Sequence, residues 1–344
     1  MCWTRSSSCE EVRVMENLLE IRNLKITTLR GKNTVRLLDK VDLSVKKKCS
    51  FGVVGESGCG KSITANAILG LLPYPLRVSE GSIRYDSKDG EKELLKLSKK
   101  EMRDVRGQEI SMIFQEPMTS LDPIFTVEMQ MFEALSFHHP QMSRAEMRDR
   151  SLEMLRRVNI PRPEQTLASY AHQLSGGQLQ RIMIAIALIN DPRLLLADEP
   201  TTALDVTIQA QILKLMNDLK EQNDTSIIMI THDLGVIAET CEEVAVFYAG
   251  QIVEQANVVE LFKNTAHPYT LGLLRAVTSL GGENRRLYTI PGIVPPGGQW
   301  SQGCRFADRC DKCMEKCKKE MPALTEAAPG HLCRCFLHSK EVEQ

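Results

Sequence analysis

The chain has 344 residues, of which 42% are hydrophobic and 25% charged, and its formal net charge at pH 7 is -1. This balance is typical of soluble globular proteins and excludes the strong overall positive field by which many proteins bind nucleic acids or anionic lipids. The longest purely apolar run, residues 182–189, falls well short of the roughly 20 residues that cross a bilayer as a helix.

The N-terminal residues precede any recognisable element. Residues 1–15 contain no apolar stretch of the kind that marks a secretory signal peptide, and we expect them to form a disordered lead-in. Residues 18–28 and 35–45 are predicted strands that flank a turn at residues 31–33, and residues 81–87 form a further predicted strand.

A glycine-rich motif follows in the stretch SFGVVGESGCGKSITANAILGLL, whose pattern predicts a buried strand, a turn and a helix. The spacing Gly55-x4-Gly60-Lys61-Ser62 is that of a phosphate-binding P-loop. Its glycines let backbone N–H groups close around phosphate oxygens, and the helix directs its positive end at the same anion.

Within this loop, we expect Lys61 to contact the β- and γ-phosphates and Ser62 to bind Mg²⁺. Cys59 is either a small loop residue or a redox switch. The nucleotide contacts predicted in this loop are Gly55, Glu56, Ser57, Gly58, Cys59, Gly60, Lys61, Ser62 and Ile63.

Residues 126–172 are predicted to be helical. Ser143 and Glu146 form a capping box inside this segment, and apolar residues follow them at helical spacing. A further helix begins within the sequence Leu-Ser-Gly-Gly-Gln at residues 174–178. There Ser175 and the two glycines offer a hydroxyl group, backbone N–H groups and a helix dipole to a phosphate.

Two later motifs place polar side chains at the ends of buried strands. RLLLADEP ends a predicted strand with Asp198 and Glu199, and IIMITHDLG ends another with His232. A carboxylate at the end of a parallel strand lies beside the P-loop, where Asp198 can hold Mg²⁺ and Glu199 can face the attacking water. Between these motifs, residues 205–222 are predicted to form an amphipathic helix.

Together, these motifs resemble those of the ABC ATPases. Residues 174–178 look like the signature motif of that family, Gln115 like its Q-loop residue, residues 201–205 like its D-loop, and His232 like its switch histidine. The P-loop, Q-loop, signature motif, D-loop and switch histidine occur here in the family's order.

The resemblance implies an α/β fold of the P-loop ABC type. We expect an ATPase domain over residues 16–265, with a RecA-like parallel core, a small antiparallel β subdomain and a helical subdomain at about residues 116–185. Residues 266–344 would form a short cysteine-rich C-terminal extension.

The resemblance also assigns roles around ATP. Glu199, His232 and Gln115 would be the catalytic residues, while Ser62, Gln115 and Asp198 would bind Mg²⁺; Gln115 and Asp198 also count among the nucleotide contacts. In this family the signature motif serves the ATP bound on an opposing subunit, so two such domains close face to face. The residues that would act in this way are Ser175, Gly176, Gly177 and Gln178.

The adenine contact departs from the family pattern. Relatives carry an aromatic residue in the first strand hairpin that stacks on the base, and alignment of LEIRNLKITT places Thr28 there. Because threonine cannot stack, we predict weak selectivity among nucleotide bases.

The tail points to one branch of the family. The stretches HPYTLGLL, IPGIVPP and GCRFADRC resemble the C-terminal region of ATP-binding subunits of dipeptide and oligopeptide importers, with nickel and glutathione importers as close relatives. This implies a peripheral protein at the cytoplasmic face of the cell membrane. Its partners would be a second homologous ATPase subunit, two transmembrane permease subunits and, through them, an extracytoplasmic substrate-binding protein, with no nucleic acid.

Six of the eleven cysteines lie in the last forty-odd residues. Outside oxidising compartments, cysteines are more often metal ligands or buried thiols than disulfides. The Cys310-x-x-Cys313 spacing is compatible with zinc, and reduced free thiols or a disulfide are further alternatives. Resemblance instead implies a [4Fe-4S] cluster, whose ligands would be Cys304, Cys310, Cys317 and Cys335.

Two functions of a different class share parts of this pattern. ABC ATPases of DNA repair carry two ATPase units and basic surfaces, neither of which this sequence has. The soluble ABC ATPase of iron–sulfur cluster assembly is a single unit but lacks the Pro-Gly-Ile-Val-Pro stretch and the cysteine tail. We therefore predict the ATP-hydrolysing subunit of a peptide importer.

Overall fold

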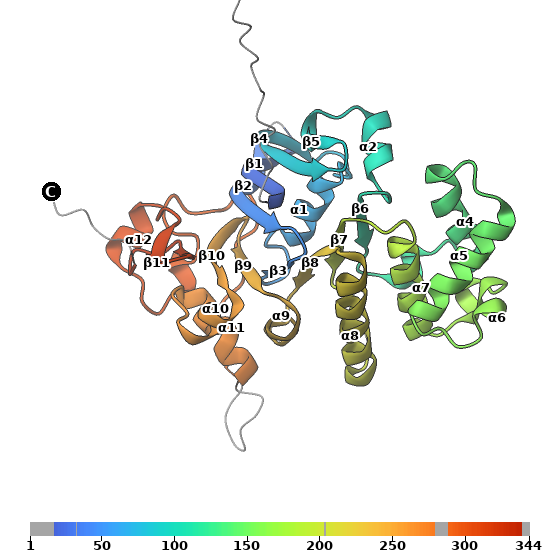
Figure 1. Ribbon diagram of the computed structural model, residues 1–344. Coiled ribbons are helices and arrows are strands. Elements are labelled where there is room, and N and C mark those ends of the chain that lie inside the picture. Colours follow the sequence, from blue (N-terminus) through green and yellow to red (C-terminus); the bar gives the residue numbers. More distant parts are fainter. Residues whose placement is uncertain (1–16, 32, 203, 279–287, 339–344) are drawn as a thin grey trace, which may run out of the picture.

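The computed structural model describes residues 17–31, 33–202, 204–278 and 288–338, built around a four-stranded and an eight-stranded sheet (Figure 1). The predicted lead-in at residues 1–15 lies outside the described residues.

The larger sheet is a parallel core with antiparallel strands added at one edge. Its order is β11-β12-β10-β9-β3-β8-β7-β6, and the five strands from β9 to β6 run parallel. β3 and β8 are buried at every position, as expected for central strands covered on both faces. The strands are β3 (Ser50–Val54), β6 (Ile110–Ile113), β7 (Leu194–Asp198), β8 (Ser226–Thr231), β9 (Glu243–Tyr248), β10 (Gln251–Asn257), β11 (Thr325–Ala328) and β12 (His331–Cys333).

The smaller sheet is antiparallel, as predicted from the sequence, and its strand order is β2-β1-β4-β5, in which β5 was not predicted. Its first hairpin turns at Gly31, whose φ of +62° suits glycine, and its strands extend beyond the predicted segments. Their buried side chains share one hydrophobic cluster with α1 and one face of the core sheet. The strands are β1 (Asn17–Arg30), β2 (Asn33–Lys46), β4 (Arg77–Ser87) and β5 (Gly90–Glu93).

The opposite face of the core sheet is covered by α8 and α9. The amphipathic helix predicted over residues 205–222 is observed as α8, where Ile212, Leu215 and Leu219 are buried and Asp205 caps the N-terminus. The helices around the core are α1 (Lys61–Ile68), η1 (Leu94–Lys96), α2 (Lys99–Val105), α8 (Val206–Asn223), α9 (Leu234–Thr240), α10 (Val258–Lys263) and α11 (Pro268–Thr278).

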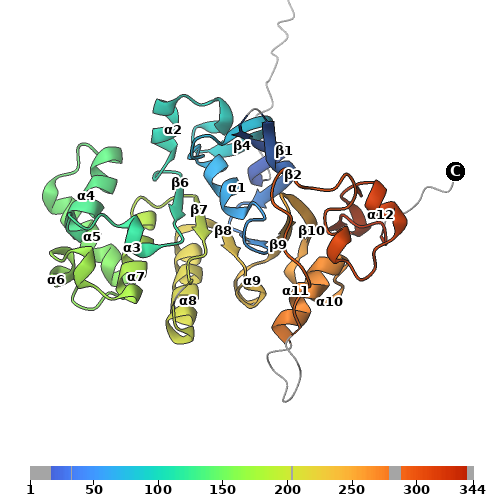
Figure 2. The same ribbon diagram turned by 180° about the vertical axis from the view of Figure 1, so that it is seen from behind.

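The helical region predicted over residues 126–172 is broken into shorter helices. The capping box of Ser143 and Glu146 is confirmed at the start of α5, and Pro163 stands at the first position of α6. Figures 1 and 2 show α4 to α7 at one end of the molecule, beyond β6, and α10 to α12 at the other. The helices of this region are α3 (Pro117–Ser120), α4 (Val127–His138), α5 (Arg144–Arg157), α6 (Pro163–Leu167), η2 (Ala171–Gln173) and α7 (Gly176–Leu188).

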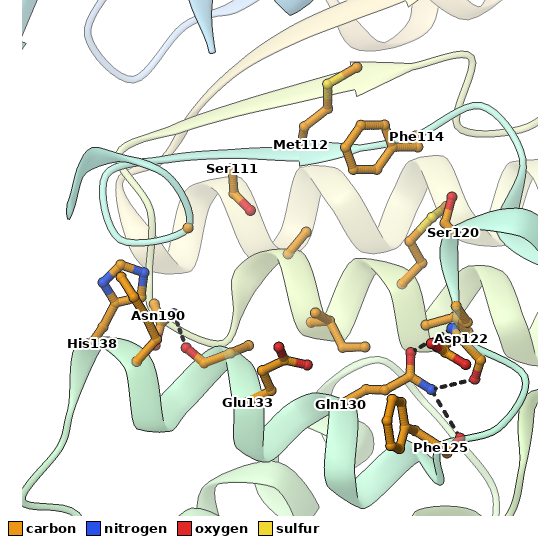
Figure 3. A pocket seen from close by; sticks show the side chains of 17 residues that line it. Ser111, Met112, Phe114, Ser120, Asp122, Phe125, Gln130, Glu133, His138 and Asn190 are labelled. Carbon is orange, nitrogen blue, oxygen red and sulfur yellow. Dashed lines mark hydrogen bonds between the residues drawn. The ribbon is translucent and has the colours of Figure 1, made fainter. Parts of the chain in front are cut away.

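A groove lies between β6 and the helices α4 and α7 (Figure 3). Three partly exposed aromatic side chains line it, namely Phe114, Phe125 and Phe137. Phe114 immediately precedes Gln115, so the groove adjoins the predicted Q-loop. Across the described part of the chain, helices are too short or too polar to span a membrane.

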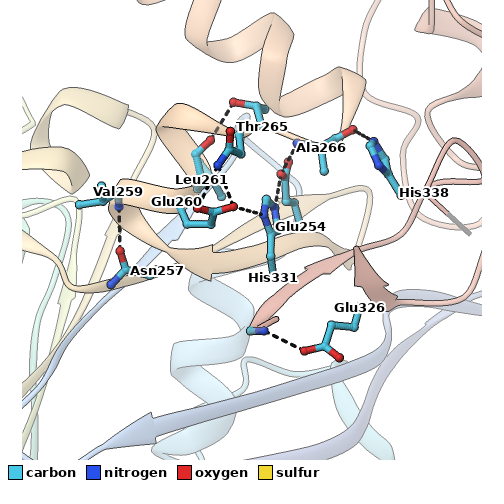
Figure 4. A network of polar contacts seen from close by, with 12 residues as sticks. Glu254, Asn257, Val259, Glu260, Leu261, Thr265, Ala266, Glu326, His331 and His338 are labelled. Carbon is cyan, nitrogen blue, oxygen red and sulfur yellow. Dashed lines mark hydrogen bonds and ion pairs between the residues drawn. The ribbon is translucent and has the colours of Figure 1, made fainter. Parts of the chain in front are cut away.

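The C-terminal segment continues the core sheet, because its hairpin β11–β12 pairs with β10. Figure 4 shows the polar centre of this junction. The fully buried Glu254 of β10 accepts the backbone N–H groups of Ala266 and His267 at 2.7 and 3.0 Å and lies 2.8 Å from Nε2 of His331. The short helices here are η4 (Ala307–Arg309) and α12 (Glu315–Lys319). The predicted division of the chain at residues 265 and 266 stays a prediction.

Candidate nucleotide-binding site

The loop between β3 and α1 adopts a backbone that requires glycine. Gly55, Gly58 and Gly60 have φ values of +155°, +77° and +111°. A methyl group on Gly55 would stand 2.3 Å from the carbonyl oxygen of Phe247, and one on Gly60 would stand 2.3 Å from Cδ2 of Leu38. Backbone conformation therefore favours glycine at all three positions, and the Phe247 backbone also excludes a side chain at Gly55, as in loops that wrap N–H groups around an anion.

Lys61 is held against this loop. Its buried side chain donates from Nζ to the carbonyl oxygens of Gly55 and Glu56, at 2.7 and 3.2 Å. The ammonium group thus lies where a bound phosphate would be an alternative acceptor. The neighbouring Cys59 is fully buried, and burial raises the pKa of its thiol. A protonated thiol is a poor nucleophile, which favours a small loop residue over a redox switch.

Asp198, at the end of β7, meets the start of α1. Burial raises the pKa of Asp198, while the neighbouring Ser62 side chain acts to lower it. The Oδ1 atom of Asp198 is buried and has no hydrogen-bond partner among the described residues. A buried carboxylate oxygen without a donor, beside a hydroxyl group, is oxygen chemistry that suits Mg²⁺. Ser62 and Asp198 therefore fit the predicted ion.

Two of the predicted catalytic side chains, Gln115 and His232, contact the third, Glu199. Nε2 of Gln115 donates to Glu199 Oε2 at 3.2 Å, and Nδ1 of His232 lies 3.3 Å from Oε1. Thr202 adds a hydrogen bond to Oε2 at 2.8 Å. Although burial raises the pKa of Glu199, the hydrogen bonds from Thr202 and His232 outweigh it and lower this pKa below its usual value. The carboxylate is therefore ionised at neutral pH and able to accept a proton.

The signature residues stand apart from this group. Ser175 caps α7: its hydroxyl accepts the N–H of Gln178 at 3.4 Å, and its own N–H donates to Gln178 Oε1 at 3.0 Å. Methyl groups built on Gly176 and Gly177 would meet no atom closer than 3.5 Å. In the described residues, no hydrogen bond joins this helix start to the loop at 55–63. The signature is thus open to an external anion.

In the tail, one narrow cavity brings together all four cysteines predicted as cluster ligands, Cys304, Cys310, Cys317 and Cys335. Cys313 and Cys333 do not line it. All nine cysteines in the described ranges are free thiols. The same part of the chain holds no group of three or more His, Cys, Asp or Glu side chains arranged for a metal ion.

Sequence reasoning missed three residues that support the nucleotide site. Thr202 hydrogen-bonds Glu199, while Tyr269 and Arg309 contact Glu56 in the P-loop. Thr202 lies inside the D-loop at residues 201–205, so its position in that motif could have indicated a role near the nucleotide. Tyr269 and Arg309 are more than 200 residues from their partner, and no local pattern predicts such contacts.

Comparisons with known proteins agree with this geometry. The ABC transporter family matches residues 38–202, and the C-terminal region of oligopeptide/dipeptide transporters matches residues 253–317. The chain is 49% identical to a probable peptide ABC transporter ATP-binding protein, y4tR, of Sinorhizobium fredii, over 94% of this chain and 96% of that protein. It is 47% identical to the oligopeptide transport ATP-binding protein AppD of Bacillus subtilis, over 95% and 98%.

Solved structures show the same fold. The dimeric post-hydrolysis structure of the ATP-binding cassette MJ0796, bound to ADP and Pi, superposes with a TM-score of 0.62 and 29% identity, covering 70% of this chain and 98% of that one. Because similarity to the curated relatives runs through both the P-loop region and the tail, the chain belongs to the ABC transporter family, as an ATP-binding subunit.

Proposed function

We propose that this chain is the ATP-hydrolysing motor subunit of a multi-subunit importer of dipeptides or oligopeptides. One observation carries the proposal: similarity to peptide-transport ATP-binding proteins extends over nearly the whole chain, including residues 253–317 of the tail. Import of nickel or glutathione by a complex of the same group is the alternative. ATPases of DNA repair or of iron–sulfur cluster assembly are disfavoured by the same relatives.

Each residue of the site has a distinct role in ATP hydrolysis. The P-loop and Lys61 bind the β- and γ-phosphates, and Ser62 and Asp198 hold Mg²⁺, which neutralises phosphate charge when it is bound. Glu199, kept ionised by its hydrogen bonds, takes a proton from the attacking water. Such general-base assistance typically contributes 10²–10⁴-fold in rate. Gln115 and His232 orient the water and the carboxylate.

A second ATPase subunit completes each nucleotide site. Ser175 and the adjacent N–H groups of α7 are exposed at a helix N-terminus, which favours an anion but has no partner in this chain's own P-loop. We infer that these groups contact the γ-phosphate of ATP bound to a homologous, distinct subunit. ATP then closes the pair, and hydrolysis reopens it.

The aromatic groove supports the proposal that this chain binds transmembrane permease subunits. Phe114, Phe125 and Phe137 line the groove that adjoins Gln115, and a short cytoplasmic helix of a permease subunit would bury their exposed rings. Movement of that helix would reach Glu199 through Gln115, because the two are hydrogen-bonded. The chain would thus be a peripheral protein at the cytoplasmic face of the membrane. An extracytoplasmic binding protein would be reached through the permeases.

The tail cavity supports a [4Fe-4S] cluster as the cofactor. The four cysteines that line it are the four implied by family resemblance, and Cys313, which zinc-type spacing would have used, lies outside. Zinc draws all its ligands to about 2.3 Å from one atom, whereas a cluster binds each thiolate at a separate iron. Because the described residues hold no group of three or more His, Cys, Asp or Glu side chains placed for a metal ion, the choice of a cluster over zinc rests on the family resemblance and on which cysteines share the cavity. When bound, the cluster would cross-link the C-terminal segment through the four cysteines.

Two experiments test these proposals. In proteoliposomes holding the assembled transporter, we expect the binding protein loaded with a dipeptide or oligopeptide to stimulate ATP hydrolysis. Stimulation by nickel or glutathione alone would assign the alternative substrate. For the tail, anaerobic purification should yield about four irons and four sulfides per chain. Stoichiometric zinc without iron or sulfide would contradict the cluster.

A further inference from the structure

The P-loop of this chain contains a carboxylate. Glu56 directly follows the first glycine of the motif, and its side chain is about one-third exposed. A negative charge in a loop that binds a nucleotide triphosphate opposes binding, since like charges a few ångströms apart repel even at an intermediate effective dielectric. Some other group must compensate this charge for the loop to bind ATP well.

Arg309, from the C-terminal tail, provides that group. Its Nη1 and Nη2 atoms donate to Oε2 and Oε1 of Glu56, at 2.6 and 3.0 Å, in a two-pronged arrangement. The Arg309 side chain is only 5% exposed, so this pair is poorly screened by salt. Nε donates to the Pro291 carbonyl at 2.8 Å, and the guanidinium lies 3.4 Å from the Tyr248 hydroxyl. These contacts fix the cation in place.

Tyr269 holds the backbone of the same P-loop residue. Its hydroxyl oxygen accepts the N–H of Glu56 at 2.9 Å, and its ring is fully buried against Tyr248 and Phe306. Tyr269 belongs to the HPYTLGLL stretch, to which sequence reasoning assigned no chemistry. The tail therefore forms hydrogen bonds with both the backbone and the carboxylate of Glu56.

We propose that Arg309 is a positioning residue for ATP binding, which neutralises and orients Glu56 so that the P-loop presents a net attractive surface to the phosphates. This inference rests on the proposed ATP-binding role of the loop. It assigns to the peptide-transporter tail a direct part in the nucleotide site of its own chain. Electrostatic compensation, in addition to packing, is its physical basis.

The test is a set of equilibrium binding titrations with a fluorescent ATP analogue and Mg²⁺. We expect Arg309→Met to weaken binding on the order of tenfold at low salt. The effect should be smaller at high salt, where ions screen the repulsion between the phosphates and the uncompensated, partly exposed Glu56. Glu56→Gln should bind at least as tightly as the unmodified chain. The double variant Glu56→Gln/Arg309→Met should regain most of the lost affinity. Arg193→Met is the control, because it breaks an arginine–carboxylate pair with Asp86 that does not touch the P-loop.

Rescue separates charge compensation from packing. A double variant that binds as weakly as Arg309→Met would overturn the proposal, and so would unchanged affinity in Arg309→Met. If Arg309→Met does not fold, Arg309→Lys decides, because it keeps the charge: affinity within about threefold supports compensation, and a tenfold loss refutes it. If the unmodified chain binds no ATP, the proposed function itself fails, a result distinct from these.

Discussion

Replacing Glu254 by glutamine removes one charge from the junction between the core sheet and the tail while keeping the side-chain shape. The carboxylate accepts two backbone N–H groups, from Ala266 and His267, and pairs with His331, all within 3.0 Å (Figure 4). The amide of glutamine has one acceptor oxygen, so its NH₂ group must face at least one of these donors.

The expected loss of folding stability follows from the complete burial of Glu254. Glu254 has no exposed surface, and loss of its charge leaves a backbone N–H group or the His331 ring without a buried acceptor. Breaking one side of a buried charged pair typically costs about 3–5 kcal/mol, and each hydrogen bond to a charged group contributes about 1.5–3 kcal/mol. We therefore expect Glu254→Gln to destabilise the tail junction by about 3–5 kcal/mol.

The same pair predicts a pH dependence. The hydrogen bond to Glu254 raises the pKa of His331 above its usual value of 6.5, against the opposing effect of burial, with Glu260 also nearby. Because the folded pKa exceeds the unfolded one, this stabilisation is complete below about pH 6.5 and is lost as pH rises through the folded pKa. The Glu254→Gln variant should lose most of this dependence.

Urea unfolding followed by Trp300 fluorescence measures both effects. Trp300 lies in the tail, with the Arg305 guanidinium 3.5 Å above its ring, and Trp3→Phe removes the other tryptophan. Glu239→Gln, at an exposed helical position, is the matched control and should leave stability unchanged. Equal midpoints for Glu254→Gln and this control, at pH 6 and pH 8, would refute the reasoning.

Three further predictions concern the nucleotide site. Gly55→Ala should abolish ATP binding in equilibrium titrations, because the methyl group would meet the Phe247 carbonyl at 2.3 Å; binding at the original affinity would show that the loop can shift. Glu199→Gln should slow phosphate release by the assembled complex 10²–10⁴-fold and trap ATP in a closed pair, whereas unchanged turnover would remove it as the base. Since Thr28 cannot stack on adenine, GTP should compete with ATP within about tenfold in affinity; failure of a large excess of GTP to displace ATP would contradict this.

The proximity of Gln115, Glu199 and His232 was predictable because each of them follows a parallel strand. Gln115 follows β6, Glu199 follows β7 and His232 follows β8, and these three strands are neighbours in the sheet. Their carboxyl ends meet at one edge, so residues far apart in sequence arrive together. The sequence therefore predicted that these residues lie near one another, but not their contacts with Glu199.

The tail was predictable only in part. Resemblance selected the four cysteines that share a cavity, whereas spacing alone left Cys313 as a candidate. The hairpin of β11 and β12 went unpredicted, because TEAA and HLC have neither the length nor the alternation of a typical strand. β12 forms by pairing with β10, which lies far earlier in the chain, and β11 pairs with β12. The Glu56–Arg309 contact spans 253 residues.

ATP turnover by the chain alone and in its assembly is the most direct test of the proposal that two subunits share each nucleotide site. With its monomeric state verified by light scattering, the isolated chain should bind ATP but hydrolyse almost none, and addition of its companion ATPase and the permeases should restore turnover. Ser175→Arg should leave binding at this chain's own P-loop intact and block hydrolysis of the ATP held by its companion. Rapid hydrolysis by a chain that stays monomeric throughout would contradict the shared site.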